Sequence, residues 1–279
     1  MPIYSSKEVL RLKLSCMLLP HLRELCEKLN IETTAKAKDM INKITQYPLV
    51  EVENAIDEFI KEKYKEKVEK RRAIISDEEL KRELAKVKEF SWGVIQGQLD
   101  QKIQTEYVRK FCRYEELLES VKQKLHHEIS SYVICTWYNH WTTVLIEEHI
   151  SSHPRVVPAL KNVKGIDLFF SGQPFDLKVT YLPRGYDIVR AKDNPKELAK
   201  WMYEHQGEQR FGEENRFYVV LCNEKNPEES WKLKRDFPFV FKAIDDFLDR
   251  ENVSRKDELE FTYKKKTYKS LAKILIISR

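Results

Sequence analysis

The sequence predicts an α/β (α+β) protein: a mixed central sheet flanked by helices, preceded by an all-helical N-terminal region. Two observations support this class. Apolar residues recur with a helical period over much of the first 90 residues, whereas the later segments alternate between strand and helix patterns. The chain has 279 residues, which suits one large domain or two unequal ones. We place a boundary near residue 90, between a region 1–90 and a region 91–279.

The composition is that of a folded intracellular protein. Charged residues make up 34% of the chain and hydrophobic residues 42%. Because the net charge is only +5, binding of a polyanion would require the basic residues to be clustered. Five cysteines without a C-x-x-C pair favour reduced thiols and argue against a zinc site. With no secretion signal, no long apolar run and no glycine-rich phosphate loop, we expect a cytoplasmic protein without a membrane partner or a nucleotide cofactor.

Residues 14–46 predict a helical hairpin. Two helix-period stretches flank "NIETTAKAK", in which one of the two threonines is the expected N-cap of the second helix. The segment "TAKAKDMI" resembles the signature of SAP-type DNA-binding motifs, with Ala35 where the family usually has glycine. The resemblance implies that Lys36 and Lys38 contact DNA. An ordinary helical hairpin in a larger bundle explains the pattern equally well.

Residues 50–90 predict highly charged helices, with a new helix beginning at Ser76 in "SDEE". The basic run "KVEKRR" favours a solvated helix face over a phosphate contact. Gly93 and Gly97 then indicate a turn where a compact domain begins. If the helical hairpin contacts phosphates, deleting residues 1–72 should weaken DNA binding and its salt dependence more than it harms folding of the remainder.

The second half of the chain supplies the elements of a sheet. Residues 114–150 predict one or two long helices with an apolar stripe formed by Val133, Trp137, Trp141, Val144 and Leu145. Strands "VKGIDLFF" and "PFDLKVTYL" follow, then a helix near 195–206, the strand "RFYVVLCN", a helix containing "VFKAIDDFLD", and a closing pair, "ELEFTYKKKTY" and "AKILIIS". This order implies a mixed sheet flanked by helices.

The hairpin "GIDLFFSGQPFDLKVTYLP" carries acidic residues among apolar ones. If its turn is centred on Ser171 and Gly172, Asp167 lies opposite Asp176, with β-carbons about 5 Å apart. The two negative charges repel each other in this position, and the single positive charge of Lys178 neutralises them only in part. A divalent cation between the carboxylates would reverse the sign of the interaction. The alternative is an amphipathic hairpin with one wet, charged face.

The hairpin is similar to the PD-(D/E)xK nuclease superfamily. Its first acidic position is Asp167, preceded by Ile166 instead of proline, and the second element is Asp176-Leu177-Lys178. An acid-x-base triplet alone is common by chance. The preceding long helix, the hairpin spacing and the following helix and strand extend the resemblance over roughly residues 115–225, and imply a restriction-endonuclease-like core.

The resemblance implies a magnesium site, in which Mn²⁺ can substitute for Mg²⁺. Asp167, Asp176 and the Leu177 carbonyl would be the metal ligands, and Lys178 would orient the attacking water and stabilise charge on phosphorus. The family's further helix acid would be Glu147 or Glu148. We favour Glu147, as a ligand of a second metal ion or of its water, because Glu148 falls on the apolar stripe.

The function implied is a Mg²⁺-dependent DNA endonuclease resembling type II restriction enzymes. Residues 1–90 would grip double-stranded DNA, residues 91–279 would be catalytic, and a homodimer would cut both strands. Arg155 and Arg184, near the site in sequence, are candidate phosphate contacts. Two alternatives remain: a non-cleaving DNA-binding or scaffold protein on a nuclease fold, and a repair or RNA nuclease of the same fold.

Overall fold

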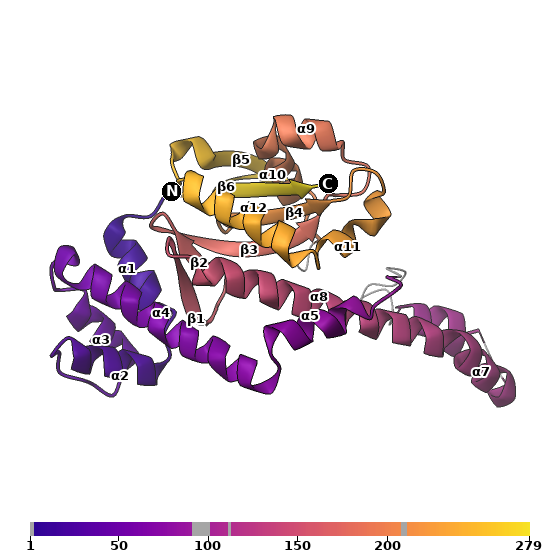
Figure 1. Ribbon diagram of the computed structural model, residues 1–279, viewed down its shortest axis with the longest axis horizontal. Helices are drawn as coiled ribbons and strands as arrows, with labels where there is room; N and C mark the ends of the chain where they lie inside the picture. The colour runs from indigo at the N-terminus through magenta and orange to yellow at the C-terminus, as the bar shows by residue number, and fades with distance from the viewer. Residues whose placement is uncertain (1–2, 91–100, 111–112, 208–210) are drawn as a thin grey trace. The chain divides into compact units, whose positions relative to one another are not determined.

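The chain is an α+β protein with a mixed six-stranded sheet, which confirms the predicted class (Figure 1). The computed structural model describes residues 3–90, 101–110, 113–207 and 211–279. The chain forms two compact units: Met1–Ile74 together with Ile146–Arg279, and the intervening segment Ile75–Leu145. The N-terminal helices therefore belong with the sheet, whereas the sequence suggested a boundary near residue 90.

Four helices open the first unit: α1 (Ser6–Ser15), α2 (Leu19–Lys28), α3 (Ala37–Ile44) and α4 (Leu49–Ile74). The α2–α3 hairpin was predicted, but the expected threonine N-cap is wrong. Lys36 occupies the N-cap of α3, and the Thr34 hydroxyl donates to the Lys36 carbonyl at 3.0 Å instead. Helix α1 was not anticipated, although its capping box, formed by Ser5 and Glu8, is a recognisable start signal.

The N-terminal helices share a hydrophobic core with one end of the sheet. Buried side chains of α1–α4 pack with Val157, Leu160, Ile166 and Phe169. The backbone joins the same parts, because the amides of Leu160 and Lys161 both donate to the Cys16 carbonyl, at 3.1 and 2.9 Å. The helices are thus an integral layer of this unit (Figure 1).

The strand order in the sheet is β1-β2-β3-β4-β6-β5. The strands are β1 (Val156–Val163), β2 (Ile166–Phe170), β3 (Gln173–Tyr181), β4 (Arg216–Cys222), β5 (Glu258–Tyr263) and β6 (Lys266–Ser278). Strands β1–β2–β3 form an antiparallel meander, β3, β4 and β6 are parallel, and β5 runs antiparallel to β6. The mixed sheet therefore combines two hairpin-type edges with a parallel centre.

Two strands differ from the sequence interpretation. Strand β1 was missed because Pro158 and polar residues obscure its pattern; an edge strand tolerates a proline that a central strand would not. The closing pair was divided at the wrong place. The turn lies at Lys264–Lys265, so "KTYKSLAKILIIS" is one strand of 13 residues.

Helices cover both faces of the sheet (Figure 1). They are α9 (Ile188–Asp193), α10 (Pro195–Glu204), α11 (Ser230–Leu233) and α12 (Phe237–Arg250), with short 3₁₀ turns at Pro227–Glu229 and Arg255–Asp257. Adjacent residues of β4 identify the two layers: Phe217 contacts Phe247 of α12, with ring centroids 5.6 Å apart, whereas Tyr218 contacts Tyr203 of α10 at 5.8 Å. Side chains alternate across a strand, so α10 and α12 lie on opposite faces.

The second unit is helical. It contains α5 (Asp77–Ala85), a π-helix at Ile103–Val108, α7 (Tyr114–Ser120), a π-helical turn at Val121–Leu125 and most of α8 (His126–Ser152), which continues into the first unit. Ser76 caps α5 as predicted, accepting from the Glu79 amide at 3.1 Å. The expected turn at Gly93 and Gly97 lies outside the described residues.

The predicted apolar stripe of α8 is partly wrong. Val133 and Trp137 are 56% and 36% exposed, whereas Cys135 and Tyr138 are buried. Phe90 packs against the Tyr138 ring at a centroid distance of 5.4 Å. Both sets of residues fit a helical period, so the packing partner decides which face is buried.

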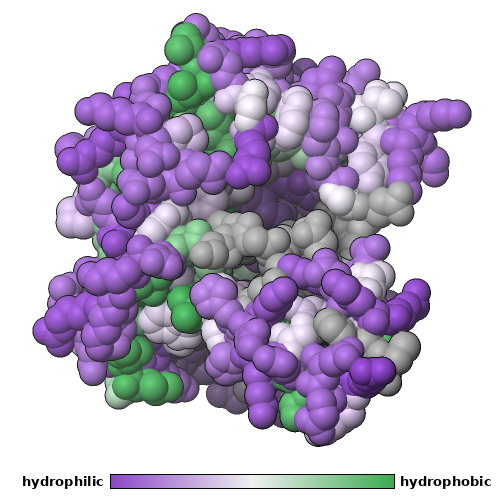
Figure 2. Space-filling view, turned by 90° about the vertical axis from the view of Figure 1, so that its right-hand side faces the viewer, coloured by the Kyte–Doolittle hydropathy of each residue, from purple (hydrophilic) through white to green (hydrophobic). Residues whose placement is uncertain are grey.

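The surface agrees with the high charge content. Figure 2 shows a face on which hydrophilic side chains predominate and hydrophobic ones gather only in small groups. Over the stretches that the structure describes, no helix combines the length and the apolar character needed to cross a lipid bilayer.

Candidate functional site

The β2–β3 hairpin has the predicted register. Leu168 pairs with Phe175 and Phe170 with Gln173, so Asp167 and Asp176 follow as the next opposed positions. Ser171 and Gly172 form the turn with φ of 47° and 68°, the left-handed pair that a tight two-residue hairpin requires. The turn chemistry and the alternation of residues were therefore enough to place the two carboxylates together.

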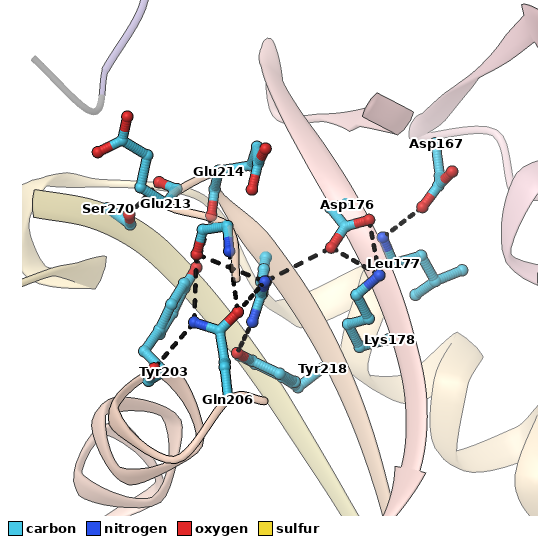
Figure 3. Close-up of polar contacts among 12 residues, drawn as sticks. Asp167, Asp176, Leu177, Lys178, Tyr203, Gln206, Glu213, Glu214, Tyr218 and Ser270 are labelled. Carbon is cyan, nitrogen blue, oxygen red and sulfur yellow. Dashed lines mark hydrogen bonds and ion pairs between the residues drawn. The ribbon is translucent and has the colours of Figure 1, made fainter. Parts of the chain in front are cut away.

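The two aspartates are in electrostatic contact. Asp167 Oδ2 accepts a hydrogen bond from the Leu177 amide at 2.8 Å, and Lys178 Nζ lies 2.9 Å from Asp176 Oδ1 (Figure 3). Burial raises the pKa of Asp167; the amide of Leu177 opposes that shift, and the negative charge of Asp176 adds to it. The two carboxylates therefore concentrate negative charge at this hairpin, with the Lys178 ammonium beside Asp176.

Glu147 joins this site from helix α8. It lines a pocket of about 360 Å³ together with Asp167 and Leu177; α4 and β1 complete the walls. Burial raises the pKa of Glu147 to about 7, and the charge of Asp167 contributes in the same direction. Helix α8 and strand β2 therefore bring Glu147 and Asp167 to one pocket, beside the strand that carries Asp176.

Glu148 has a different environment. Its carboxylate pairs with the Arg71 guanidinium of α4, with Arg71 Nε 3.1 Å from Oε1 and a second contact from Nη2 to Oε2. Both side chains are largely buried. The structure therefore places Glu147, and not Glu148, in the pocket with Asp167.

Sequence reasoning missed Arg216. This residue opens β4 opposite Asp176 and is 6% exposed, and its Nε lies 3.4 Å from Asp176 Oδ2. Its other nitrogens donate to Gln206 Oε1 at 2.6 Å and to the Tyr218 hydroxyl at 3.3 Å. Figure 3 labels three of its partners, Asp176, Gln206 and Tyr218. The signal available in the sequence was a charged residue at the start of the apolar strand "RFYVVLC".

Lysines surround the carboxylates. Lys67 and Lys161 line the pocket, and Lys234, which follows α11, is 2% exposed. Burial lowers the pKa of Lys234 to about 7, and the charge of Glu147 opposes that shift. These residues were also missed, because helices and strands far apart in the sequence bring them together.

The four predicted DNA contacts have different surroundings. Lys36 and Lys38 are exposed on the α2–α3 hairpin, and Arg184 is exposed and pairs with Glu228 at 2.7 Å. Arg155 contacts the end of α12, donating to the carbonyls of Leu248 and Asp249 and to the Asn252 side chain. These bonds occupy the Arg155 guanidinium within the fold.

The donor set fits a divalent cation of the magnesium type. Hard carboxylate oxygens are the ligands such an ion prefers, and their mutual repulsion is what it would relieve. Asp176 is instead turned towards Lys178 and Arg216. Within the described parts of the chain, no three His, Cys, Asp or Glu side chains are already grouped as a metal site.

Comparison with protein-family models, with curated proteins and with solved structures finds no match.

Proposed function

We propose that this chain is a Mg²⁺-dependent DNA endonuclease that hydrolyses phosphodiester bonds. The observation that supports this function best is the opposition of Asp167 and Asp176 across the β2–β3 hairpin, with Lys178 beside them and Glu147 in the adjoining pocket. Mixed strand order and helices on both faces are compatible with a restriction-endonuclease-like core.

Each residue has a distinct role in the proposed reaction. Asp167, Asp176 and the Leu177 carbonyl would hold Mg²⁺, or Mn²⁺ in its place, and Glu147 would hold a second ion or its water. When bound, the cation supplies Lewis-acid stabilisation of the scissile phosphate. The Lys178 ammonium orients the attacking water and stabilises the negative charge that grows on the phosphate oxygens. Burial of Glu147 and Asp167 strengthens these electrostatic effects.

The substrate proposed is double-stranded DNA, cut in the manner of a type II restriction endonuclease. Cutting both strands would require two sites, which a homodimer provides. The SAP-like hairpin would add phosphate contacts through Lys36 and Lys38, which are exposed.

One observation favours a second candidate, a DNA-binding protein on a nuclease fold that does not cut. Arg216 and Lys178 both place positive charge on Asp176, the carboxylate that a cation would need. In a non-cleaving protein these two positively charged side chains would take the place of the metal ion permanently. In the nuclease, the Asp176 carboxylate would leave its ion pairs with them and bind the metal ion.

Incubating plasmid DNA with and without Mg²⁺, then mapping the ends, tests the proposal. We expect Mg²⁺-dependent cleavage that Asp176→Asn abolishes; asparagine keeps a hydrogen-bond acceptor for Arg216, so the fold should survive. Asp193→Asn, on exposed Asp193 at the end of α9, is the matched control and should cut normally. DNA binding without cleavage at any Mg²⁺ concentration would favour the second candidate.

A further inference from the structure

A basic turn joins β5 to β6 at the edge of the sheet opposite the β1–β2 end. Lys264, Lys265 and Lys266 are consecutive and exposed, and the first two have φ of 46° and 67°. Asparagine and glycine are the residues favoured in such a turn, so backbone preference does not explain the lysines. Three adjacent positive charges facing solvent favour contact with a polyanion.

A small aromatic pocket adjoins this turn. Its volume is about 280 Å³, and Phe211, Tyr263 and Tyr268 line it with Lys264 and Lys266. The Phe211 ring stacks on Tyr263 with centroids 4.3 Å apart and lies 5.1 Å from Tyr268. All three rings are only partly buried. Aromatic rings flanked by cations are typical of sites that bind single-stranded nucleic acid, because a base stacks on the rings while the cations contact phosphates.

The turn lies at the same end of the parallel strands as the carboxylates. Asp176 pairs with Arg216, and Arg216 with Ala272 of β6. Lys266 precedes Ala272 by six residues, roughly 20 Å along the strand, and β6 lies two strand spacings, roughly 10 Å, from β3. A DNA strand held at the carboxylates would reach the turn within roughly six or seven nucleotides at a rise of about 3.4 Å.

We propose that the β5–β6 turn and its aromatic pocket bind a single-stranded segment of the DNA substrate. Lys265 and Lys266 contact phosphates, and a base released from the duplex stacks on the Phe211–Tyr263 pair. This inference rests on the proposed function, since it takes DNA to lie at the carboxylate site. It specifies the substrate class further: a duplex with a single-stranded extension is bound more tightly than a blunt duplex.

Binding of the full-length protein to two labelled probes, without divalent metal so that nothing is cut, tests this inference. One probe is a blunt duplex, and the other is the same duplex with about twelve unpaired thymidines, longer than the six or seven needed to span the distance. We expect the extension to raise the wild-type affinity about tenfold, the usual effect of one stacked base.

Two variants separate the charge contribution from the stacking contribution. Lys265→Gln with Lys266→Gln should remove most of the gain and lower the salt slope on the extended probe by about 1.4, since each single-strand phosphate contact contributes about 0.7. Phe211→Leu should remove the stacking part of the gain while leaving the slope unchanged, because stacking releases no counterions. Thermal unfolding of each variant checks that the fold is intact.

Lys65→Gln with Lys242→Gln is the matched control. These side chains are 79% and 75% exposed on α4 and α12, and the variant loses the same charge. It should keep the full gain from the extension. If the extension gives the wild type no gain while the blunt duplex is bound and cut, the inference is wrong and the proposed function stands. If neither probe is bound and plasmid is not cut, both fail.

Discussion

Two neighbouring glutamates of α8 have opposite surroundings, because adjacent helical residues are turned about 100° from each other. Glu147 lines the carboxylate pocket, whereas Glu148 pairs with Arg71. We expect Glu147→Gln to slow Mg²⁺-dependent cleavage by about 100-fold or more, because the glutamine cannot carry the negative charge needed beside Asp167. Single-turnover cleavage at saturating Mg²⁺ measures the effect.

Glu148→Gln is the matched control for this prediction. It should leave the single-turnover rate nearly unchanged but lower the free energy of unfolding by about 1–3 kcal/mol, because a largely buried arginine loses its charged partner. Denaturant unfolding of both variants separates the two effects. The reverse pattern, with slow cleavage in Glu148→Gln only, would overturn the assignment of the helix acid.

Lys178 is expected to act on the reaction and not on metal affinity. Its ammonium lies 2.9 Å from Asp176, close enough to reach a water or phosphate oxygen held there. Lys178→Met should therefore retain Mg²⁺ binding, measured by calorimetry, while single-turnover hydrolysis falls by about two orders of magnitude or more. An unchanged rate would remove Lys178 from the mechanism.

Among the elements, the α2–α3 hairpin is proposed to contact DNA phosphates, and measurements of DNA binding can test this role. Lys38 lines a groove with Arg11 between α1 and α3, and Lys36 precedes α3. If the hairpin contacts DNA, Lys36→Gln with Lys38→Gln should reduce the slope of log affinity against log salt on blunt duplex by about 1.8, two contacts at about 0.9 each. The Lys65→Gln, Lys242→Gln protein controls for the loss of charge. An equal slope in all three proteins would make the hairpin a purely structural element.

At the scale of the whole molecule, α1–α4 and the sheet share a hydrophobic core, so deleting these helices should destabilise the rest of the fold. Val157, Leu160, Ile166 and Phe169 pack with α1–α4, and each buried apolar side chain contributes about 1.5–3 kcal/mol. Their exposure would cost up to about 12 kcal/mol, comparable with the total stability of a domain. We therefore expect a fragment 75–279 to lack the cooperative thermal unfolding of the full chain, as circular dichroism would show. Cooperative unfolding of this fragment would contradict the prediction and show that the N-terminal helices are dispensable for folding.

The sequence by itself determined the features that depend on neighbours along the chain. Alternation on either side of Ser171–Gly172 placed Asp167 opposite Asp176, and "SDEE" located the start of α5. Helical periods identified α2, α3 and α4, and the mixed order of elements gave the fold class. Local backbone preference and side-chain periodicity suffice for these, because the interacting residues are close in sequence.

Only the tertiary structure decided which faces and charges meet. Periodicity left two apolar faces on α8, and contact with Phe90 selected the one that carries Tyr138. Arg216 lies 40 residues after Asp176 in the chain yet directly opposite it in the sheet, because strand pairing between β3 and β4 is parallel and needs a long crossover. Lys234, which follows α11, lies close enough for its charge to interact with that of Glu147, 87 residues earlier in the chain. These contacts join residues far apart in the chain and depend on how the elements pack. For such pairs, a single sequence specifies neither which elements are in contact nor their register.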